Sequence, residues 1–281
     1  MYYEKLQELY SKIDLSKLQK INADMENRYA MTIIIAFVKS LQLNQTLHNK
    51  IENENSFLFL STLRGACEEL IILEYIQQQI VEEDRSLIII SLLKESMRKE
   101  LIQQRLFIQK YRPAQPVLTE MLAEHFPGEE ISSILSRNGI TGKILPRTEQ
   151  MARKVGLEEL YNFVYRASCS FVHFNPRIML RTVWYENNLP EQSNISIANF
   201  NKYYFSFCSF YGSYLFGLIF QKFKSYLDLS KEDESTINEI IKLIRHTVHY
   251  PELVTYEECN IKRPKTELTI INRFLENQLF D

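Results

Sequence analysis

FLFLSTLRGACEELIILEYI, residues 57–76, is the stretch that decides the fold class. Its apolar residues fall on most sides of a helix, a pattern that is typical of a buried central helix. Arg64 and Glu68 are among its few polar residues, and because they lie four positions apart they share one side of the helix. A buried charge without a partner is unfavourable, so we expect these two residues to pair with each other.

Helical patterns continue outward from this stretch over most of the 281 residues, and seven glycines and eight prolines are too few for a fold with many tight turns. We predict an all-α fold, an irregular multi-helix bundle. The expected helices cover about 2–12, 14–22, 25–50, 57–83, 85–111, 146–155, 157–174, 196–226, 231–249 and 266–279, and residues 176–195 fit a short strand or a helical turn. One domain over 1–281 is expected, with residues 1–50 and 231–279 packed on a central bundle of residues 56–226.

The stretch 203–220, YYFSFCSFYGSYLFGLIF, has 18 residues without a charge, the lower limit for a helix that spans a membrane. It also holds four tyrosines and three serines, more polar groups than lipid favours, so a second central helix is the preferred interpretation. The first residues of the chain carry charges where a signal peptide has an apolar run. We therefore expect a cytoplasmic protein with no membrane partner.

Metal and cofactor binding have little support in the sequence. The cysteines, Cys67, Cys169, Cys208 and Cys259, are scattered without a CxxC pair, which predicts reduced thiols. His246 and His249 lie three apart near the end of a predicted helix, where the helix dipole favours cationic residues without any further function. No HExxH motif, glycine-rich phosphate loop or dinucleotide fingerprint occurs. We predict no metal and no cofactor.

Charge is distributed unevenly along the chain. The net charge is −2, but residues 137–181 hold eight basic residues against three acidic ones. Two interpretations stay open: a solvated basic surface, or a surface that binds phosphate groups. In the second, the RNA-binding residues are Arg147, Arg153, Lys154, Arg177 and Arg181.

The same basic segment contains YRASCSFVHFNPR, residues 165–177. Arg166 and His173 are seven residues apart, which is two helical turns, so both project from one face at roughly 10.5 Å along the axis. Ser170 lies between them on that face. An imidazole can move the proton of a ribose 2′-hydroxyl, and a guanidinium can bind phosphate and stabilise charge on its oxygens. Arg166, Ser170 and His173 are therefore the candidate catalytic residues, with Arg64, Glu68 and Asn175 as supporting residues.

An all-α chain with Arg-x6-His near the end of a helix resembles the HEPN superfamily, whose signature is Arg-x4-6-His. The chain is also similar to an uncharacterised bacterial helical family that pairs an Arg-x3-Glu helix with a later Tyr-x-x-x-Ser-x-x-Val-His stretch. The matching residues are Arg64 and Glu68, and Tyr165 to His173.

The resemblance implies a metal-independent endoribonuclease, or an RNA-binding protein, that acts as a homodimer in toxin–antitoxin or phage-defence systems, with Arg166 and His173 as the catalytic residues. A partner protein or antitoxin is a further expectation. Ala167 stands where many active HEPN proteins have a polar residue, and Ser170 is the residue expected to supply that polar group.

Two alternatives remain. The protein could be a non-catalytic interaction module in which Arg64, Glu68 and the helix of Arg166 form a structural polar network. It could also bind a small ligand against the aromatic residues of 203–220, although such an aromatic stripe is usually part of a core.

Overall fold

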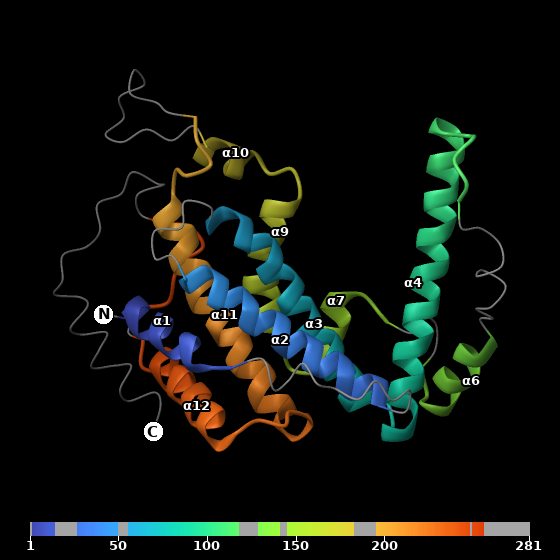
Figure 1. Ribbon diagram of the computed structural model, residues 1–281, viewed down its shortest axis with the longest axis horizontal. Coiled ribbons are helices and arrows are strands. Elements are labelled where there is room, and N and C mark those ends of the chain that lie inside the picture. Colours follow the sequence, from blue (N-terminus) through green and yellow to red (C-terminus); the bar gives the residue numbers. More distant parts are fainter. Residues whose placement is uncertain are drawn as a thin grey trace.

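The computed structural model describes residues 2–14, 27–49, 56–117, 129–140, 145–182, 195–247 and 249–255. Every regular element in these ranges is a helix, and the predicted all-α fold class is confirmed. Figure 1 shows a body of packed helices on one side and a single long helix that stands apart on the other.

Three helices form the centre of the body: α2 (Arg28–His48), α3 (Phe59–Gln79) and α11 (Asn201–Phe223), which pack against one another. The two stretches predicted to be central supply α3 and α11. Fifteen residues of α11 are buried, which explains why its apolar residues occur all around the helix. Within the described ranges, no helix has the length and apolar character needed to cross a membrane.

The contact between α2 and α11 is close because α11 has a glycine there. Asn44 on α2 is buried, and its amide nitrogen donates to the carbonyl oxygens of Ser40 at 2.8 Å and Gly212 at 3.1 Å. A Cβ atom on Gly212 would lie 2.9 Å from the Asn44 Oδ1 atom. Any larger residue at position 212 would therefore push the two helices apart.

Other polar groups in the centre also have partners. The buried Glu74 on α3 pairs with Lys222 on α11 at 2.7 Å. His48 Nε2 lies 3.1 Å from the Ser209 hydroxyl, and the His48 ring stacks on Tyr10. Burial lowers the pKa of His48 to about 4 because the charged imidazolium loses its water. The Glu74 carboxylate and His48 Nε2 thus have partners in the interior, whereas His48 Nδ1 is buried without a hydrogen-bond partner.

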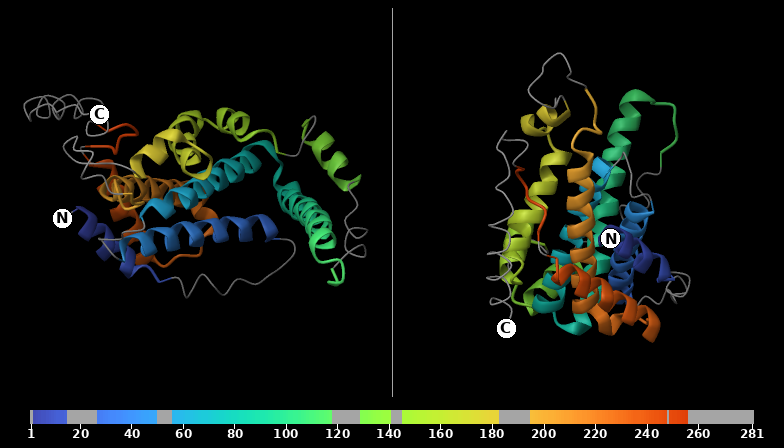
Figure 2. Two further views of the ribbon diagram at one scale, coloured as in Figure 1. Left: turned by 90° about the horizontal axis from the view of Figure 1, so that it is seen from above. Right: turned by 90° about the vertical axis from the view of Figure 1, so that its left-hand side faces the viewer.

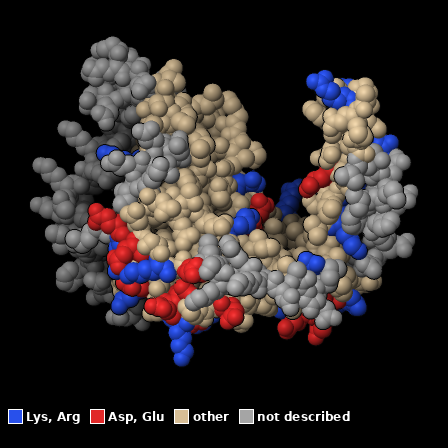
Figure 3. All heavy atoms as spheres, in the orientation of Figure 1, with Lys and Arg blue, Asp and Glu red and all other residues tan. Residues whose placement is uncertain are grey.

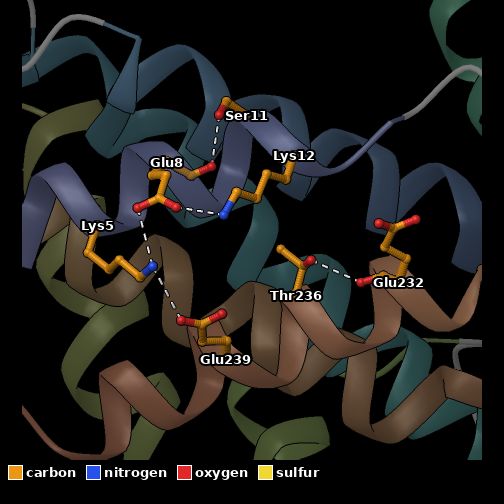
Figure 4. Close-up of polar contacts among 7 residues, drawn as sticks. All are labelled: Lys5, Glu8, Ser11, Lys12, Glu232, Thr236 and Glu239. Carbon is orange, nitrogen blue, oxygen red and sulfur yellow. Dashed lines mark hydrogen bonds and ion pairs between the residues drawn. The ribbon is translucent and has the colours of Figure 1, made fainter.

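Helices α1 (Tyr2–Lys12) and α12 (Lys231–Arg245) cover the outer side of α2 and α11. Their apolar faces are buried, and ion pairs connect their exposed edges (Figure 4). Lys5 on α1 pairs with Glu8 at 3.2 Å and with Glu239 on α12 at 3.4 Å. Such exposed pairs add little stability, so burial of the apolar faces is what holds these helices.

Helix α4 (Glu82–Tyr111) is the long helix that stands apart, and α6 (Glu129–Arg137) packs on its first half. The buried carboxylate of Asp84 joins them, because it accepts from Arg137 and from Asn138 at 2.8 Å each. Figure 2 shows α4 leaving the body as an arm. In Figure 3 a broad hollow separates this arm from the rest of the molecule.

The remaining elements line one side of α3 and α11. They are α7 (Thr148–Lys154), α8 (Glu158–Leu160), a π-helical turn (Tyr161–Tyr165), α9 (Arg166–Val172) and α10 (Pro176–Thr182). Two sequence predictions differ from this arrangement: Pro146 precedes α7 and is not in its first turn, and the predicted helix 157–174 contains a π-turn and ends at Val172. Of the two alternatives left open for 176–195, residues 176–182 adopt the helical one. The predicted helices over 14–22 and 266–279 lie, apart from residue 14, outside the described residues.

Candidate functional site

The segment that carries Arg166 and His173 is a helix with an irregular start. The π-turn Tyr161–Tyr165 has i→i+5 hydrogen bonds, which bring residues five apart to the same side of the helix. The guanidinium of Arg166 consequently lies over the ring of Tyr161, 5.5 Å from its centroid. Helix α9 then runs to Val172, and the amide of His173 makes the last helical hydrogen bond, to the Cys169 carbonyl at 3.1 Å. His173 itself has an extended backbone and ends the helix.

One side of this segment faces α3 and forms a closed polar network. Arg64 donates from Nη2 to the Tyr165 hydroxyl at 2.9 Å and from Nε to Cys169 Sγ at 3.2 Å. The Tyr165 hydroxyl lies 3.4 Å from Glu68 Oε1, and Thr148 on α7 donates to the same oxygen at 3.1 Å. The Arg64–Glu68 ion pair is 3.8 Å long. The network thus joins α3, α7 and the start of α9.

The charges in this network explain its pKa shifts. Burial raises the pKa of Tyr165, while its hydrogen bond with Arg64 acts in the opposite direction. The pKa of Arg64 is raised as well, chiefly by the same hydrogen bond to Tyr165. Tyr165 therefore stays a neutral hydroxyl, and Arg64 stays a cation near neutral pH.

The family stretch Tyr-x-x-x-Ser-x-x-Val-His has Tyr165, Val172 and His173 at its matching positions, while Cys169 takes the place of the serine. Because Cys169 is also the residue that accepts from Arg64, the substituted position belongs to the closed network. The Arg64–Glu68 pair, predicted to support the catalytic residues, contacts Tyr165 and Cys169, and these contacts do not include Arg166 or His173.

The other side of α9 borders a cavity of about 280 Å³, which we call the arginine cavity. Ten residues from α9 and its start, α10 and the segment 249–255 line it: Asn162, Arg166, Ala167, Ser170, Phe171, Asn175, Arg177, Ile178, Arg181 and Leu253. It contains five of the residues predicted from the sequence as catalytic, supporting or RNA-binding. Among its described lining residues are three arginines and no acidic residue.

Arg166 and Ser170 lie on this side of α9, as their spacing predicted. The Arg166 side chain is 58% exposed, and its ion pair with Glu149 on α7 is 4.0 Å long. The Ser170 hydroxyl donates to the Arg166 carbonyl at 3.4 Å. The guanidinium of Arg166 is thus accessible and weakly paired, which is what a ligand-binding cation needs.

His173 is exposed, and it lies between two lining residues, Phe171 and Asn175, without lining the cavity itself. Its two neighbours in the chain are apolar and exposed, Val172 at 44% and Phe174 at 82%, and Met179 on α10 is 55% exposed. The side chain of His173 is therefore open to solvent, in a stretch of the chain that also exposes apolar residues.

Helix α10 supplies the other two arginines of the cavity. Asn175 Oδ1 accepts from the amide of Arg177 at 3.0 Å at the start of this helix. Arg177 and Arg181 follow four residues apart, and both donate to the carbonyl oxygen of Leu253, at 2.6 and 3.2 Å. Arg181 is only 2% exposed, so it is not part of an open basic surface.

The three basic residues of α7 lie elsewhere. Arg147 caps the start of α7 and is exposed. Arg153 pairs with Glu158 at 3.0 Å, and Lys154 lies 5.7 Å from the ring centroid of Tyr75. All three are exposed at α7, and none of them lines the arginine cavity. The predicted set of RNA-binding residues is thus divided between two places.

Sequence reasoning missed Leu253 and Thr148. Leu253 contributes a backbone carbonyl, which has no sequence signal, and Thr148 is an ordinary residue in the first turn of a helix. The described cysteines, Cys67, Cys169 and Cys208, are free thiols, and Cys259 lies outside the described residues. No group of three or more potential metal ligands occurs in the part of the chain that the structure describes.

A protein-family model matches residues 30–190, more than half of the chain, and the chain belongs to this family, the family of unknown function DUF5677. The matched range includes both the Arg64–Glu68 pair and the Arg166–His173 segment. No curated protein and no solved structure matches the chain.

Proposed function

We propose that this protein is a HEPN-like RNA-binding protein that cleaves RNA without a metal, with Arg166 and His173 as the catalytic residues. The observation that carries the proposal is the placement of an accessible, weakly paired guanidinium and an exposed imidazole at the two ends of one short helix. A polyanion is the natural ligand of such a surface.

The chemistry needs only these two side chains and the RNA. The neutral imidazole of His173 takes the proton of a ribose 2′-hydroxyl, and the 2′-oxygen attacks the adjacent phosphorus. The bond from phosphorus to the 5′-oxygen breaks, that oxygen takes a proton from solvent, and a 2′,3′-cyclic phosphate remains. Arg166 binds the non-bridging oxygens and stabilises the charge that builds on them.

The shape of the molecule supports an RNA path beside α7. In the view of Figures 1 and 3, α7 lies at the base of the hollow between the α4 arm and the body. Arg147, Arg153 and Lys154 are exposed on that helix. Electrostatic attraction to phosphates along this helix lends RNA affinity without base specificity.

A homodimer is part of the proposal. Val172 and Phe174, on either side of His173 in the chain, and Met179 on α10 are exposed apolar residues, and such residues are typical of interfaces where they gather on one surface. A second copy docked on them would cover the open side of His173 and place a second α9 helix nearby. The biological setting that we propose, a bacterial toxin–antitoxin or phage-defence system, follows from the resemblance to HEPN proteins.

The test is RNA cleavage in EDTA by the purified full-length protein, with product ends analysed for cyclic phosphate. We expect His173→Gln and Arg166→Gln each to lower the rate by about 100-fold or more. Both side chains are exposed, so the melting temperature of each variant should stay close to that of the natural protein.

Arg98→Gln is the matched control, because Arg98 is an exposed arginine on α4, away from the arginine cavity. Cleavage that persists in His173→Gln would contradict the proposal. The proposal would also be contradicted if the natural protein, at concentrations where it is a dimer, left the RNA intact.

The α4 arm favours a second candidate function, a protein-interaction module. Leu93, Leu106, Phe107 and Tyr111 on this helix are all more than half exposed. If α4 is a docking surface between copies of the chain, Phe107→Ser should lower the mass of the oligomer measured by light scattering, while Phe174→Ser should leave that mass unchanged. The reverse result supports a dimer that forms at α9.

A further inference from the structure

The outer part of α4, residues 92–111, contributes no buried residue to the core. The buried residues of this helix are Asp84, Ile88 and Ser91, all near its start. A single helix is only marginally stable in water, because most helical stability in proteins comes from packing of an apolar face. The outer part of α4 therefore lacks the packing that normally stabilises a helix, although it has side chains suited to such packing.

An apolar stripe runs along this outer part. It consists of Leu93, Met97, Leu101, Ile108 and Tyr111. Steps of three, four and seven residues place these side chains on one side of the helix over about 27 Å, roughly opposite the buried side of α4. Leu93 is 56% exposed and Tyr111 is 54% exposed. Beside them lies the ring of Phe107, whose centroid is 4.7 Å from that of Tyr111.

The charges of this stretch are mainly basic. Residues 93–112 hold six basic side chains and two acidic ones. Lys94, Arg98 and Arg105, at steps of four and seven, form a basic row along one edge of the apolar stripe. Both acidic residues have partners within α4, since Glu95 pairs with a lysine at 2.6 Å and Glu100 accepts from a serine at 2.8 Å. The surface thus combines an apolar stripe with a positive edge.

A second α4 helix complements this surface poorly. In an antiparallel pair related by a two-fold axis, the same edges meet, so the basic row of one helix lies along the basic row of the other. In a parallel pair the row lies along the opposite edge of the stripe, which carries one acidic residue, Glu100. A helix with its own row of aspartates and glutamates provides opposite charge along the whole row.

The exposed side chains of α4 also favour a protein over lipid or RNA. Ile102 and Leu106, which are 44% and 65% exposed, lie on the other side of the helix from the stripe. A lipid surface covers only one side of a helix, and RNA is bound by cations and aromatic rings more than by aliphatic groups. Aromatic residues, methionine and arginine, which α4 exposes, are enriched in protein interfaces.

We propose that residues 92–111 of α4 bind an acidic amphipathic helix of a partner protein. The apolar residues of the partner pack on the stripe, and its carboxylates pair with the basic row. Burial of the stripe supplies the packing that the outer part of α4 lacks. This interaction needs neither RNA nor His173, so it is independent of the proposed cleavage.

The test is fluorescence anisotropy of two labelled helical peptides titrated with the full-length protein. Both peptides are about three heptads long with leucine at positions a and d, and they carry either glutamate or lysine at e and g. We expect the glutamate peptide to bind at least about 10-fold more tightly than the lysine peptide, because only its charges complement the basic row. Its affinity should fall as the salt concentration rises.

Reversal of charge on α4 provides the most specific variant. The double substitution Lys94→Glu with Arg98→Glu should weaken binding of the glutamate peptide and strengthen binding of the lysine peptide, a gain that simple loss of structure does not produce. Lys242→Glu, which changes an exposed cation on α12, is the matched control and should keep the natural preference.

Phe107→Ser tests the apolar part of the surface and should weaken binding of the glutamate peptide by about 10-fold. Phe174→Ser, at another exposed phenylalanine, is its control. Because both side chains are exposed, the melting temperatures should stay within a few degrees of the natural value.

Three results would overturn the proposal. The first is equal affinity for the two peptides, or no binding of the glutamate peptide at roughly 100 μM protein. The second is a dimer that Phe107→Ser separates in light scattering, because a second copy would then cover the stripe. The third is binding to vesicles of phosphatidylcholine and phosphatidylglycerol, or to RNA, that is lost in the double variant and kept in Lys242→Glu, while the glutamate peptide does not bind.

Discussion

Arg64, on α3, contacts one side of the α9 segment, and Arg166 projects from the other side of that segment. The two arginines differ in their exposure and in their partners. Arg64 is 27% exposed and contacts Tyr165, Cys169 and Glu68. Arg166 is 58% exposed, with a ring contact to Tyr161 and an ion pair of 4.0 Å to Glu149. Arg64 forms hydrogen bonds and an ion pair with neighbouring side chains, and Arg166 is open to solvent and to the cavity. Equal charge therefore does not imply equal function.

The same contrast separates the interior from the α9–α10 surface. In the interior, the Asn44 amide, the Glu74 carboxylate and His48 Nε2 bind partners on neighbouring helices, so they hold helices together. Around the arginine cavity, charged groups from different elements point toward a shared space. Substitutions in the closed region should consequently change stability, and substitutions in the open region should change binding and cleavage.

The largest expected effect on stability concerns pH. His48 has a pKa of about 4 in the folded protein and about 6.5 when unfolded, so the unfolded chain binds more protons between these values. Stability contributed by neutral His48 is present above pH 6.5 and is lost as the pH falls toward 4, by roughly 3 kcal/mol in total. Urea unfolding at several pH values measures this loss.

His48→Gln is the variant that isolates this contribution, since glutamine is neutral and can still form a hydrogen bond with the Ser209 hydroxyl. Its unfolding free energy should fall less steeply between pH 6.5 and 4 than that of the natural protein. Equal slopes for the natural protein and His48→Gln would break the contrast between a closed interior and an open surface.

A smaller effect is expected for Arg64→Met. The substitution removes the donor to Tyr165 and Cys169 and leaves Glu68 without its ion pair. Because the side chain is partly exposed, we expect a loss of about 1–2 kcal/mol, less than for a fully buried pair. Thermal or urea unfolding provides the value. A loss below about 0.3 kcal/mol would show that the network is not structural.

Arg166→Met, the matched change on the open side, should have the smallest effect on stability, less than about 0.5 kcal/mol. Its RNA affinity should nevertheless fall, and the salt dependence of RNA binding should become weaker because one phosphate contact is lost. Fluorescence anisotropy at several salt concentrations measures both. Destabilisation by Arg166→Met equal to that of Arg64→Met would mean that both sides of α9 are structural.

Several parts of the fold and site could be predicted from the sequence. The helical period is a local property, so α2, α3, α4, α11 and α12 appear within a few residues of their expected ranges. The shared side of Arg166 and Ser170 follows from the same period. The π-turn before Arg166 and the end of α9 at Val172 were not predicted, because they depend on how this segment packs against α3 and α10.

The sequence by itself determined which segments are helices and which polar residues lie on the same side of α9, because spacing along a helix converts directly into direction. Only the tertiary structure decided that Arg181 is buried among aromatic rings, that Leu253 orients two arginines, and that His173 is not among the described residues that line the cavity. These features join residues as far as 76 positions apart in the chain, and such distant contacts arise from packing, which no local pattern records.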